Sequence, residues 1–100
     1  MKALVLTTDA QLEARAAANW YEEAEAGLGV EFISEVDRVL GLLADAPGRY
    51  PVWRPGRPYR RALLRRFPYV IFFVDEPDHV LVLAIAHQKR KPGYWLRRGR

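Results

Sequence analysis

The sequence predicts an α+β fold in which an antiparallel helical hairpin covers one face of a β-sheet. Two segments of the first half carry apolar residues at helical spacing, and three β-forming segments separated by turn residues follow in the second half. A short apolar strand precedes the helices. The chain has 100 residues, of which 50% are hydrophobic, so we expect one globular domain over residues 1–100. The expected order is strand, helix, helix, then a three-stranded antiparallel sheet.

The first strand and the first helix are predicted between residues 2 and 27. The apolar run Lys2–Leu6 predicts an edge or near-edge strand. Thr8 and Asp9 offer N-cap side chains, and Gln11 is placed to complete a capping box. Gly27 is expected to end the helix, because glycine tolerates the left-handed conformation found after a helix. Apolar residues at every fourth position, one of them a tryptophan, predict the buried face of this first helix. That face consists of Leu12, Ala16, Trp20 and Ala24, with Tyr21 beside it.

The second helix follows after a very short link, so the two helices should pack antiparallel. Pro47 and Gly48 end it, because proline cannot donate its amide and disfavours helix at the residue before it. Neither apolar face can remain in water, and both are expected to pack on the sheet. The second apolar face consists of Phe32, Ile33, Val36, Val39, Leu40 and Leu43.

The second half contains a loop and three strands. Residues 47–58 hold four prolines and two glycines, which exclude a regular element. Strands are predicted at Tyr59–Arg66, Tyr69–Val74 and His79–His87, with turns at 67–68 and 75–78. The run Val80–Ala86 is apolar at every position and predicts a central strand that is covered on both faces.

Charge divides the chain into two halves. Residues 1–53 carry a net charge of −5, and residues 54–100 carry a net charge of +9. This asymmetry indicates a polyanionic partner, either nucleic acid or an acidic protein segment, although a solvated basic face without a partner gives the same pattern. Trp53 stands beside Arg54 in the proline-rich loop, where it is either a stacking platform or a lid over a small core.

Several classes of protein are disfavoured by what the sequence lacks. Without cysteine, neither a disulfide nor a thiolate metal site can form. His79 and His87 make a poor metal site, and no glycine-rich phosphate loop or nucleophile elbow is present, so we expect no cofactor and no metal. The longest apolar run is too short to span a bilayer, and the N-terminal segment lacks the apolar length of a signal peptide. We therefore expect a soluble cytoplasmic protein without a membrane partner.

Five stretches of sequence carry a family resemblance. They are WYE at 20–22, GLG at 27–29 followed by Phe32 and Glu35-Val36, Pro47, RRALLRRFPY at 60–69 and AIAHQKRKPGYW at 84–95. Together they resemble the RelE/ParE superfamily of bacterial type II toxins over nearly the whole chain, and they are closer to the ParE-like, plasmid-stabilisation branch than to the RelE branch. The resemblance implies a toxin that is neutralised, in a heteromeric complex, by a small cognate antitoxin whose C-terminal segment wraps it.

The ParE-like resemblance implies inhibition of DNA gyrase, which such toxins trap on cleaved DNA. Gyrase inhibition needs no catalytic residue, so basic and aromatic side chains would act as interface anchors. The same surface would suit an acidic or amphipathic antitoxin segment. The expected partner-binding residues are Arg60, Arg61, Arg65, Arg66, Arg90, Tyr94, Trp95 and Trp53, with the basic tail at 97–100.

The RelE-like alternative is a metal-independent endonuclease that cleaves mRNA on the ribosome. In that case His87 would act as acid or base, Tyr94 would stack on a base, and three arginines would hold phosphate. Those arginines are Arg61, Arg65 and Arg90. His87 also has a structural interpretation, as a strand-end residue bonded to neighbouring backbone or an aromatic ring. The lysine pair that the nuclease branch places after its helices has no match in residues 48–58, which favours gyrase inhibition. A toxin-fold binding domain without toxin activity is the third interpretation.

Overall fold

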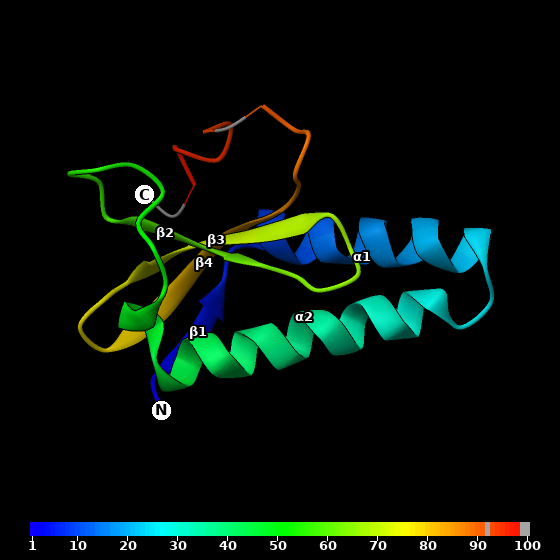
Figure 1. Ribbon diagram of the computed structural model, residues 1–100, viewed down its shortest axis with the longest axis horizontal. Helices are drawn as coiled ribbons and strands as arrows, with labels where there is room; N and C mark the ends of the chain where they lie inside the picture. The colour runs from blue at the N-terminus through cyan, green and yellow to red at the C-terminus, as the bar shows by residue number, and fades with distance from the viewer. Residues whose placement is uncertain (92, 99–100) are drawn as a thin grey trace.

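The computed structural model describes residues 1–91 and 93–98, and it has the predicted α+β fold (Figure 1). Residues 92, 99 and 100, which belong to the predicted Pro-Gly turn and the basic tail, lie outside the described residues. The elements follow the predicted order, with one additional turn of 3-10 helix after the second helix. They are β1 (Ala3–Leu6), α1 (Thr8–Ala24), α2 (Leu28–Asp45), η1 (Pro47–Arg49), β2 (Tyr59–Leu63), β3 (Tyr69–Asp75) and β4 (His79–His87).

The sheet has four strands in the order β1-β4-β3-β2. The last three strands are antiparallel neighbours, as predicted. β1 joins them at the edge and runs parallel to β4, with Ala3 opposite His79 and Leu6 opposite Val82, so the sheet is mixed. β4 therefore lies between two strands and, apart from the half-buried Leu81, its apolar run is buried on both faces, as expected.

β2 is shorter than predicted. It ends at Leu63, and the residues up to Pro68 form the turn into β3. Arg66 has a φ of 69° in this turn, a left-handed conformation that no regular strand contains. The paired arginines at 65 and 66 thus belong to a turn instead of a strand.

α1 begins one residue earlier than its predicted cap. The Thr7 hydroxyl accepts a hydrogen bond from the Ala10 N–H at 3.1 Å, so Thr7 is the N-cap and Thr8 is already helical. Gln11 does not complete a capping box, because its side-chain amide donates to the Leu6 carbonyl at 3.1 Å. Two successive threonines offer the same chemistry, and the end of β1 at Leu6 selects the first.

The predicted buried face of α1 was wrong. Trp20 is 65% exposed and Leu12 is 53% exposed, whereas Ala10 and Ala17 are buried. Alanine occupies six of the seventeen positions of this helix, so a four-residue period fits more than one face. The face built from small side chains packs inward, because it lets the helix approach the sheet closely. Tyr21 does pack in the core, stacked on Phe32 with ring centroids 5.3 Å apart.

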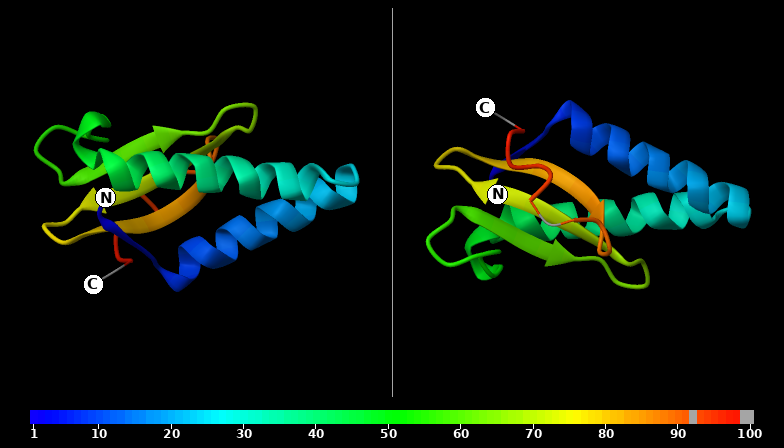
Figure 2. Two further views of the ribbon diagram at one scale, coloured as in Figure 1. Left: turned by 90° about the horizontal axis from the view of Figure 1, so that it is seen from below. Right: turned by 90° about the horizontal axis from the view of Figure 1, so that it is seen from above.

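The link between the helices is held by Glu22. Its carboxylate accepts the Gly27 N–H at 2.8 Å and the Gly29 N–H at 3.0 Å. Gly27 has a φ of 88°, but it caps the start of α2 and does not end α1, whose C-cap is Glu25. At Gly29 the helices are so close that an added Cβ would lie 2.6 Å from the Ala18 carbonyl oxygen. Figure 2 shows the helices converging toward this link.

Two hydrophobic clusters cover the two faces of the sheet. The helices pack on one face, where Ile71 and Phe73 of β3 point toward Phe32 and its neighbours. The residues that precede them along β3, Val70 and Phe72, point to the opposite face and join a second cluster around Trp95. Residues 93–98 and the loop around Trp53 cover that second face, on the side of the sheet away from the helices (Figure 2).

Candidate functional site

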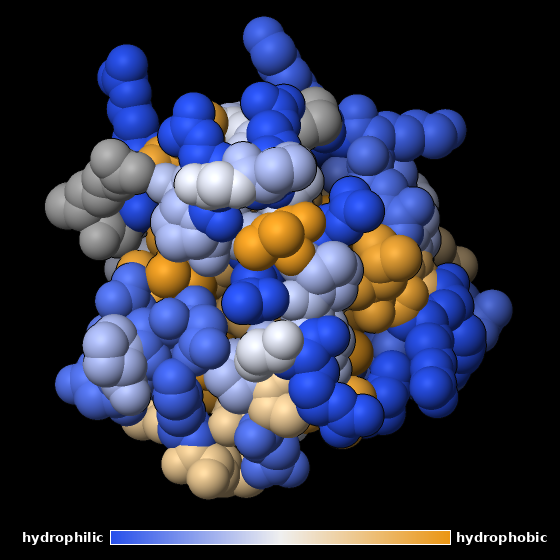
Figure 3. Space-filling view, turned by 60° about the vertical axis from the view of Figure 1, so that its left-hand side comes forward, coloured by the Kyte–Doolittle hydropathy of each residue, from blue (hydrophilic) through white to orange (hydrophobic). Residues whose placement is uncertain are grey.

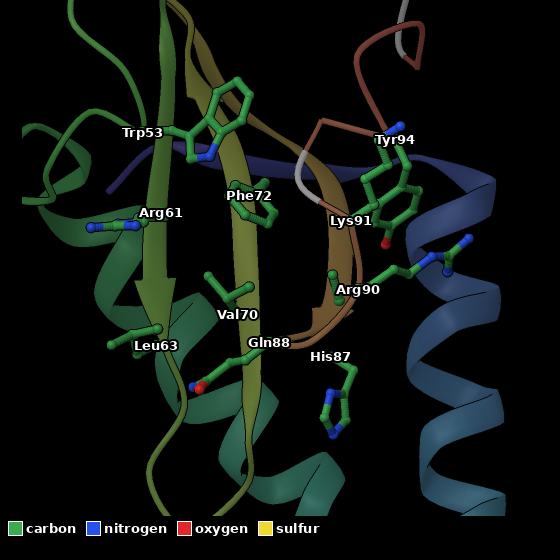
Figure 4. A pocket seen from close by; sticks show the side chains of 11 residues that line it. Trp53, Arg61, Leu63, Val70, Phe72, His87, Gln88, Arg90, Lys91 and Tyr94 are labelled. Carbon is green, nitrogen blue, oxygen red and sulfur yellow. The ribbon is translucent and has the colours of Figure 1, made fainter.

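A cleft of about 240 Å³ lies on the sheet face opposite the helices (Figure 4). Its floor is apolar and comes from β2, β3 and β4, while its rim is basic and aromatic. Trp53 stands at one end, and Tyr94 stands with Arg90 on the side that faces α1. The lining residues are Trp53, Arg61, Leu63, Val70, Phe72, Ala86, His87, Gln88, Arg90, Lys91 and Tyr94.

Strand register places the floor and one rim of this cleft. Arg61 lies opposite Phe72, and Leu63 lies opposite Val70. Val70 in turn lies opposite Ala86 of β4. Paired residues of antiparallel strands project to the same face, and successive residues alternate between faces. All five side chains therefore share the face away from the helices, and Arg61 reaches the rim because β2 is an edge strand.

Glu13 of α1 joins the far rim of the cleft to the helix layer. Its Oε1 accepts the Ile85 N–H at 3.0 Å and the Arg98 guanidinium at 2.8 Å. Its Oε2 accepts the Tyr94 hydroxyl at 2.5 Å and the Arg90 guanidinium at 3.3 Å. One carboxylate thus binds a strand, the segment after that strand, and the C-terminal segment. We call this group the Glu13 cluster.

The Glu13 cluster satisfies a backbone donor that β1 does not reach. At the end of β1 the Thr7 N–H donates to the Val82 carbonyl at 3.1 Å. Farther along β4, the Ile85 N–H is bonded by Glu13 of α1 in place of a strand. A buried N–H without an acceptor costs about 1–3 kcal/mol, so this carboxylate stabilises the part of β4 that extends beyond its pairing with β1.

The sequence interpretation missed Glu13 because it assigned the wrong face of α1 to the core. Glu13 lies three residues after Ala10 and four residues before Ala17, and both alanines are buried. Helical residues at those separations share a face. A single carboxylate on a face otherwise made of alanine is the signal that would have indicated a buried ion pair.

The electrostatics of Tyr94 follow from the same cluster. Burial, together with the hydrogen bond to Glu13, raises the pKa of the Tyr94 hydroxyl above its ordinary value. The hydroxyl therefore remains protonated and serves as a donor to the carboxylate. The Arg90 guanidinium lies over the Tyr94 ring, 3.7 Å from its centroid, and that of Arg98 lies 4.9 Å away. A base expected to stack on Tyr94 would have to compete with these cations.

Five of the predicted site residues meet in the cleft, although they come from four separate parts of the chain. Its basic members, Arg61 and Arg90, lie on opposite sides in Figure 4. Convergence of residues so far apart in sequence follows from the antiparallel strands and from the Glu13 cluster. The five residues are Trp53, Arg61, His87, Arg90 and Tyr94.

Arg60, Arg65 and Arg66 do not line the cleft. The Arg60 guanidinium donates to the Tyr50 carbonyl at 2.6 Å and is half-buried. Arg65 and Arg66 lie against α2. The Arg66 guanidinium pairs with Glu31 at 2.8 Å, and the Arg65 backbone N–H donates to a carboxylate oxygen of α2 at 2.5 Å. Their adjacency in sequence to Arg61 therefore does not put them on one surface.

Trp95 lies in the core instead of at the surface expected of a partner contact. It is fully buried, stacked on Phe72 at 4.6 Å, and contacts Trp53 at 5.0 Å and Tyr59 at 4.9 Å. Its indole N–H has no hydrogen-bond partner among the described residues. Trp53 covers this core from the loop and also lines the cleft, with the Arg54 guanidinium 4.1 Å from its ring centroid.

His87 has the contacts of its structural interpretation. Its Nδ1 accepts the Lys89 N–H at 3.1 Å, and its ring packs edge-on against Tyr69 at 5.3 Å. His79 is bonded to Asp78 at 2.7 Å in the turn before β4.

Within residues 1–91 and 93–98, no group of three or more histidine, aspartate or glutamate side chains is placed to hold a metal ion. In the same described ranges, no helix is both long and apolar enough to cross a membrane.

Comparison with known proteins gives both a family and a fold. The profile of the ParE toxin of the parDE type II toxin–antitoxin system matches residues 4–92, which confirms the ParE-like resemblance of the sequence. A chain from the chromosomal ParDE toxin–antitoxin system of P. aeruginosa has the same fold, with a TM-score of 0.74 at 17% identity, over 87% of this chain and 96% of that one. Comparison with curated proteins gave no significant match. The chain therefore belongs to the ParE toxin family of type II toxin–antitoxin systems.

Proposed function

We propose that this chain inhibits DNA gyrase in the cytoplasm and is neutralised by a cognate antitoxin. Membership of the ParE toxin family supports the toxin class. The observation that supports a binding mode of action is that polar groups in the cleft are hydrogen-bonded within the protein. The Tyr94 hydroxyl and the Arg90 guanidinium are bonded to Glu13, and the His87 Nδ1 accepts a backbone N–H. A surface whose polar groups are already bonded to other parts of the protein is suited to binding a partner.

The composition of the cleft suits a protein partner. Tryptophan, tyrosine and arginine are the residues that most often dominate binding energy at interfaces, particularly beside an apolar centre. The floor residues Val70, Phe72 and Ala86 supply that centre, and the cationic rim complements acidic side chains. Leu63 adds to this apolar surface, because it is 62% exposed at the edge strand. In this proposal both gyrase and an acidic, amphipathic antitoxin segment use the cleft.

A supercoiling assay with purified gyrase tests the proposal. The chain is expected to reduce supercoiling and to increase the amount of cleaved DNA, and the protein encoded by the neighbouring reading frame is expected to reverse both effects. Arg61→Ala should weaken inhibition, because it removes a cleft cation. Arg15→Ala is the matched control, since Arg15 is exposed on α1 and lies away from the cleft lining. Unchanged supercoiling at saturating chain would overturn the proposal.

A metal-independent endoribonuclease is the second candidate function. The observation in its favour is that His87, Arg61, Arg90 and Tyr94 line one cleft. Its test is mRNA cleavage on ribosomes, compared between the unmodified chain and the variants His87→Ala and Tyr94→Phe. A nuclease should lose nearly all cleavage in these variants, whereas an interface should weaken by degrees. Rapid mRNA loss with unchanged supercoiling would establish the nuclease in place of the gyrase inhibitor.

A further inference from the structure

The loop between η1 and β2 covers the second face of the sheet through Trp53, but the fold does not explain the arginines in and around it. Between Asp45 and Asp75 the sequence holds seven arginines and no acidic residue. The guanidiniums of two of them are hydrogen-bonded within the described residues, since Arg60 bonds a backbone carbonyl and Arg66 pairs with Glu31. Arginines without a carboxylate partner are costly to gather in one place, because like charges repel. Such a gathering points to an anionic ligand.

Three of the exposed arginines lie in or beside this loop. Arg54 and Arg57 share a tight turn, in which the Arg57 N–H donates to the Arg54 carbonyl at 3.1 Å. Arg61 follows on β2 at the rim of the cleft. None of these three guanidiniums has a carboxylate within ion-pair distance in the described part of the chain.

The C-terminal segment brings further cations to the same end of the molecule. Trp53 of the loop contacts Trp95 with ring centroids 5.0 Å apart, so the loop and residues 93–98 lie side by side (Figure 1). Arg97 is exposed in this segment, and Lys91 is exposed at the cleft rim. Figure 3 brings this end forward and shows long hydrophilic side chains projecting from its upper part. We define the basic surface as Arg54, Arg57, Arg61, Lys91 and Arg97.

The form of the ligand follows from how the aromatic rings are covered. Proteins that bind single strands offer open aromatic faces on which bases stack. Here the Arg54 guanidinium lies over Trp53 at 4.1 Å, and the Arg90 guanidinium lies over Tyr94 at 3.7 Å. The surface therefore presents cations in place of rings. Guanidinium groups bind phosphate oxygens in a bidentate manner, and phosphate contacts do not require unstacked bases.

We propose that the basic surface binds the phosphate backbone of duplex DNA without sequence preference. This inference does not depend on gyrase inhibition, since it rests on the charge and covering of this surface alone. Each guanidinium or ammonium that meets a phosphate releases a condensed counterion. A complex in which about four of the five cations each meet a phosphate has a slope of about −3.6 for log K against log salt. Its affinity falls about 10²-fold between about 50 mM and about 200 mM salt.

Fluorescence anisotropy with a short labelled DNA duplex of arbitrary sequence tests this proposal on the whole chain. Arg57→Gln should make the slope shallower by about 0.9, and Arg54→Gln with Arg57→Gln by about 1.8, for any duplex sequence. Arg15→Gln is the matched control, because it removes one exposed charge from α1 and should leave the slope unchanged. Melting temperatures equal to that of the unmodified chain show that the exposed loop variants are folded.

Four results would overturn the proposal. They are no binding to duplex at the lowest salt, tighter binding to a single strand of the same sequence, binding to polyglutamate but not to DNA, and an equal effect of Arg15→Gln and Arg57→Gln. The third result would assign the surface to an acidic protein segment. Gyrase inhibition by a chain that fails to bind duplex would refute this inference alone and would leave the proposed function intact.

Discussion

Replacing Glu13 by glutamine removes one charge from the Glu13 cluster while keeping the size of the side chain. In Glu13→Gln the amide oxygen can still accept the Ile85 N–H. The amide nitrogen is a donor, however, and it meets the Tyr94 hydroxyl and the Arg90 guanidinium, which are donors in the native cluster. Glu13→Gln therefore loses charge-assisted hydrogen bonds without leaving a cavity in the protein.

The magnitude follows from the burial of the partners. A hydrogen bond to a charged group contributes about 1.5–3 kcal/mol. The Arg98 side chain is 16% exposed and the Glu13 side chain 14%, so their pair is shielded from water, whereas Arg90 is 54% exposed and contributes little. We expect Glu13→Gln to lower the free energy of unfolding by about 2–4 kcal/mol. Such a loss is a large part of the total stability of a small domain.

Urea denaturation followed by tryptophan fluorescence measures this change. The midpoint should fall while the slope of the free energy against urea stays the same, because the surface exposed on unfolding is unchanged. Glu23→Gln is the control, since Glu23 is an exposed carboxylate on the same helix. An equal effect of the two substitutions, within about 0.5 kcal/mol, would refute the assignment of Glu13 as the link between α1 and the cleft.

Three further predictions concern packing and pH. Gly29→Ala should destabilise the chain by about 1–3 kcal/mol in thermal melting, because its Cβ would lie 2.6 Å from a backbone oxygen. Gly41→Ala, in the same helix with nothing within 4 Å, should instead stabilise it by about 0.5–1 kcal/mol, and equal shifts would contradict the close approach. The hydrogen bond from Arg38 lowers the pKa of Glu35 from 4.5 to about 2. Because the folded pKa is the lower one, about 1–2 kcal/mol of stability is present above pH 4.5 and is lost as the pH falls toward 2. Glu35→Gln should flatten that loss in denaturation measured across this range, and an unchanged profile would exclude Glu35 as its source. Trp95→Ala should lower the free energy of unfolding by about 3–5 kcal/mol, and Trp95→Phe by less than half of that, because phenylalanine keeps the ring stacking and removes the unpaired indole N–H. If urea denaturation gives the same loss for the two substitutions, the result counts against burial of an unpaired indole N–H at this position.

The fold could be predicted where one physical requirement dominates a segment. The run Val80–Ala86 is apolar at every position, and only a central strand satisfies it. The apolar face of α2 was equally clear, because large side chains such as Phe32 and Leu43 occupy one stripe and are buried. Alanine is found on buried and exposed faces alike, so the alanines of α1 did not indicate which face packs inward. That face is set by how closely the helix approaches the sheet and α2.

The candidate site was predictable only in part, because its geometry depends on long-range contacts. Strand alternation separates Arg60 from Arg61, and β2 ends at Leu63, which sends Arg65 toward α2. Trp95 could not be distinguished from a surface anchor, since its burial depends on Trp53, which comes from a distant loop. The same holds for the Glu13 cluster, whose members lie at both ends of the chain.

The parallel pairing of β1 with β4 has a consequence for the folding of the chain during synthesis. β1 is made first, and its partner strand is made only after β2 and β3. Until residues 79–87 have left the ribosome, the apolar face of α2 lacks the central strand of the sheet on which it packs in the folded chain. Contacts this distant in sequence form slowly, because the entropy of closing the intervening chain must be lost first. A product cut short before β4 therefore lacks the strand on which both clusters are built, so we expect truncated chains to yield no partly active toxin.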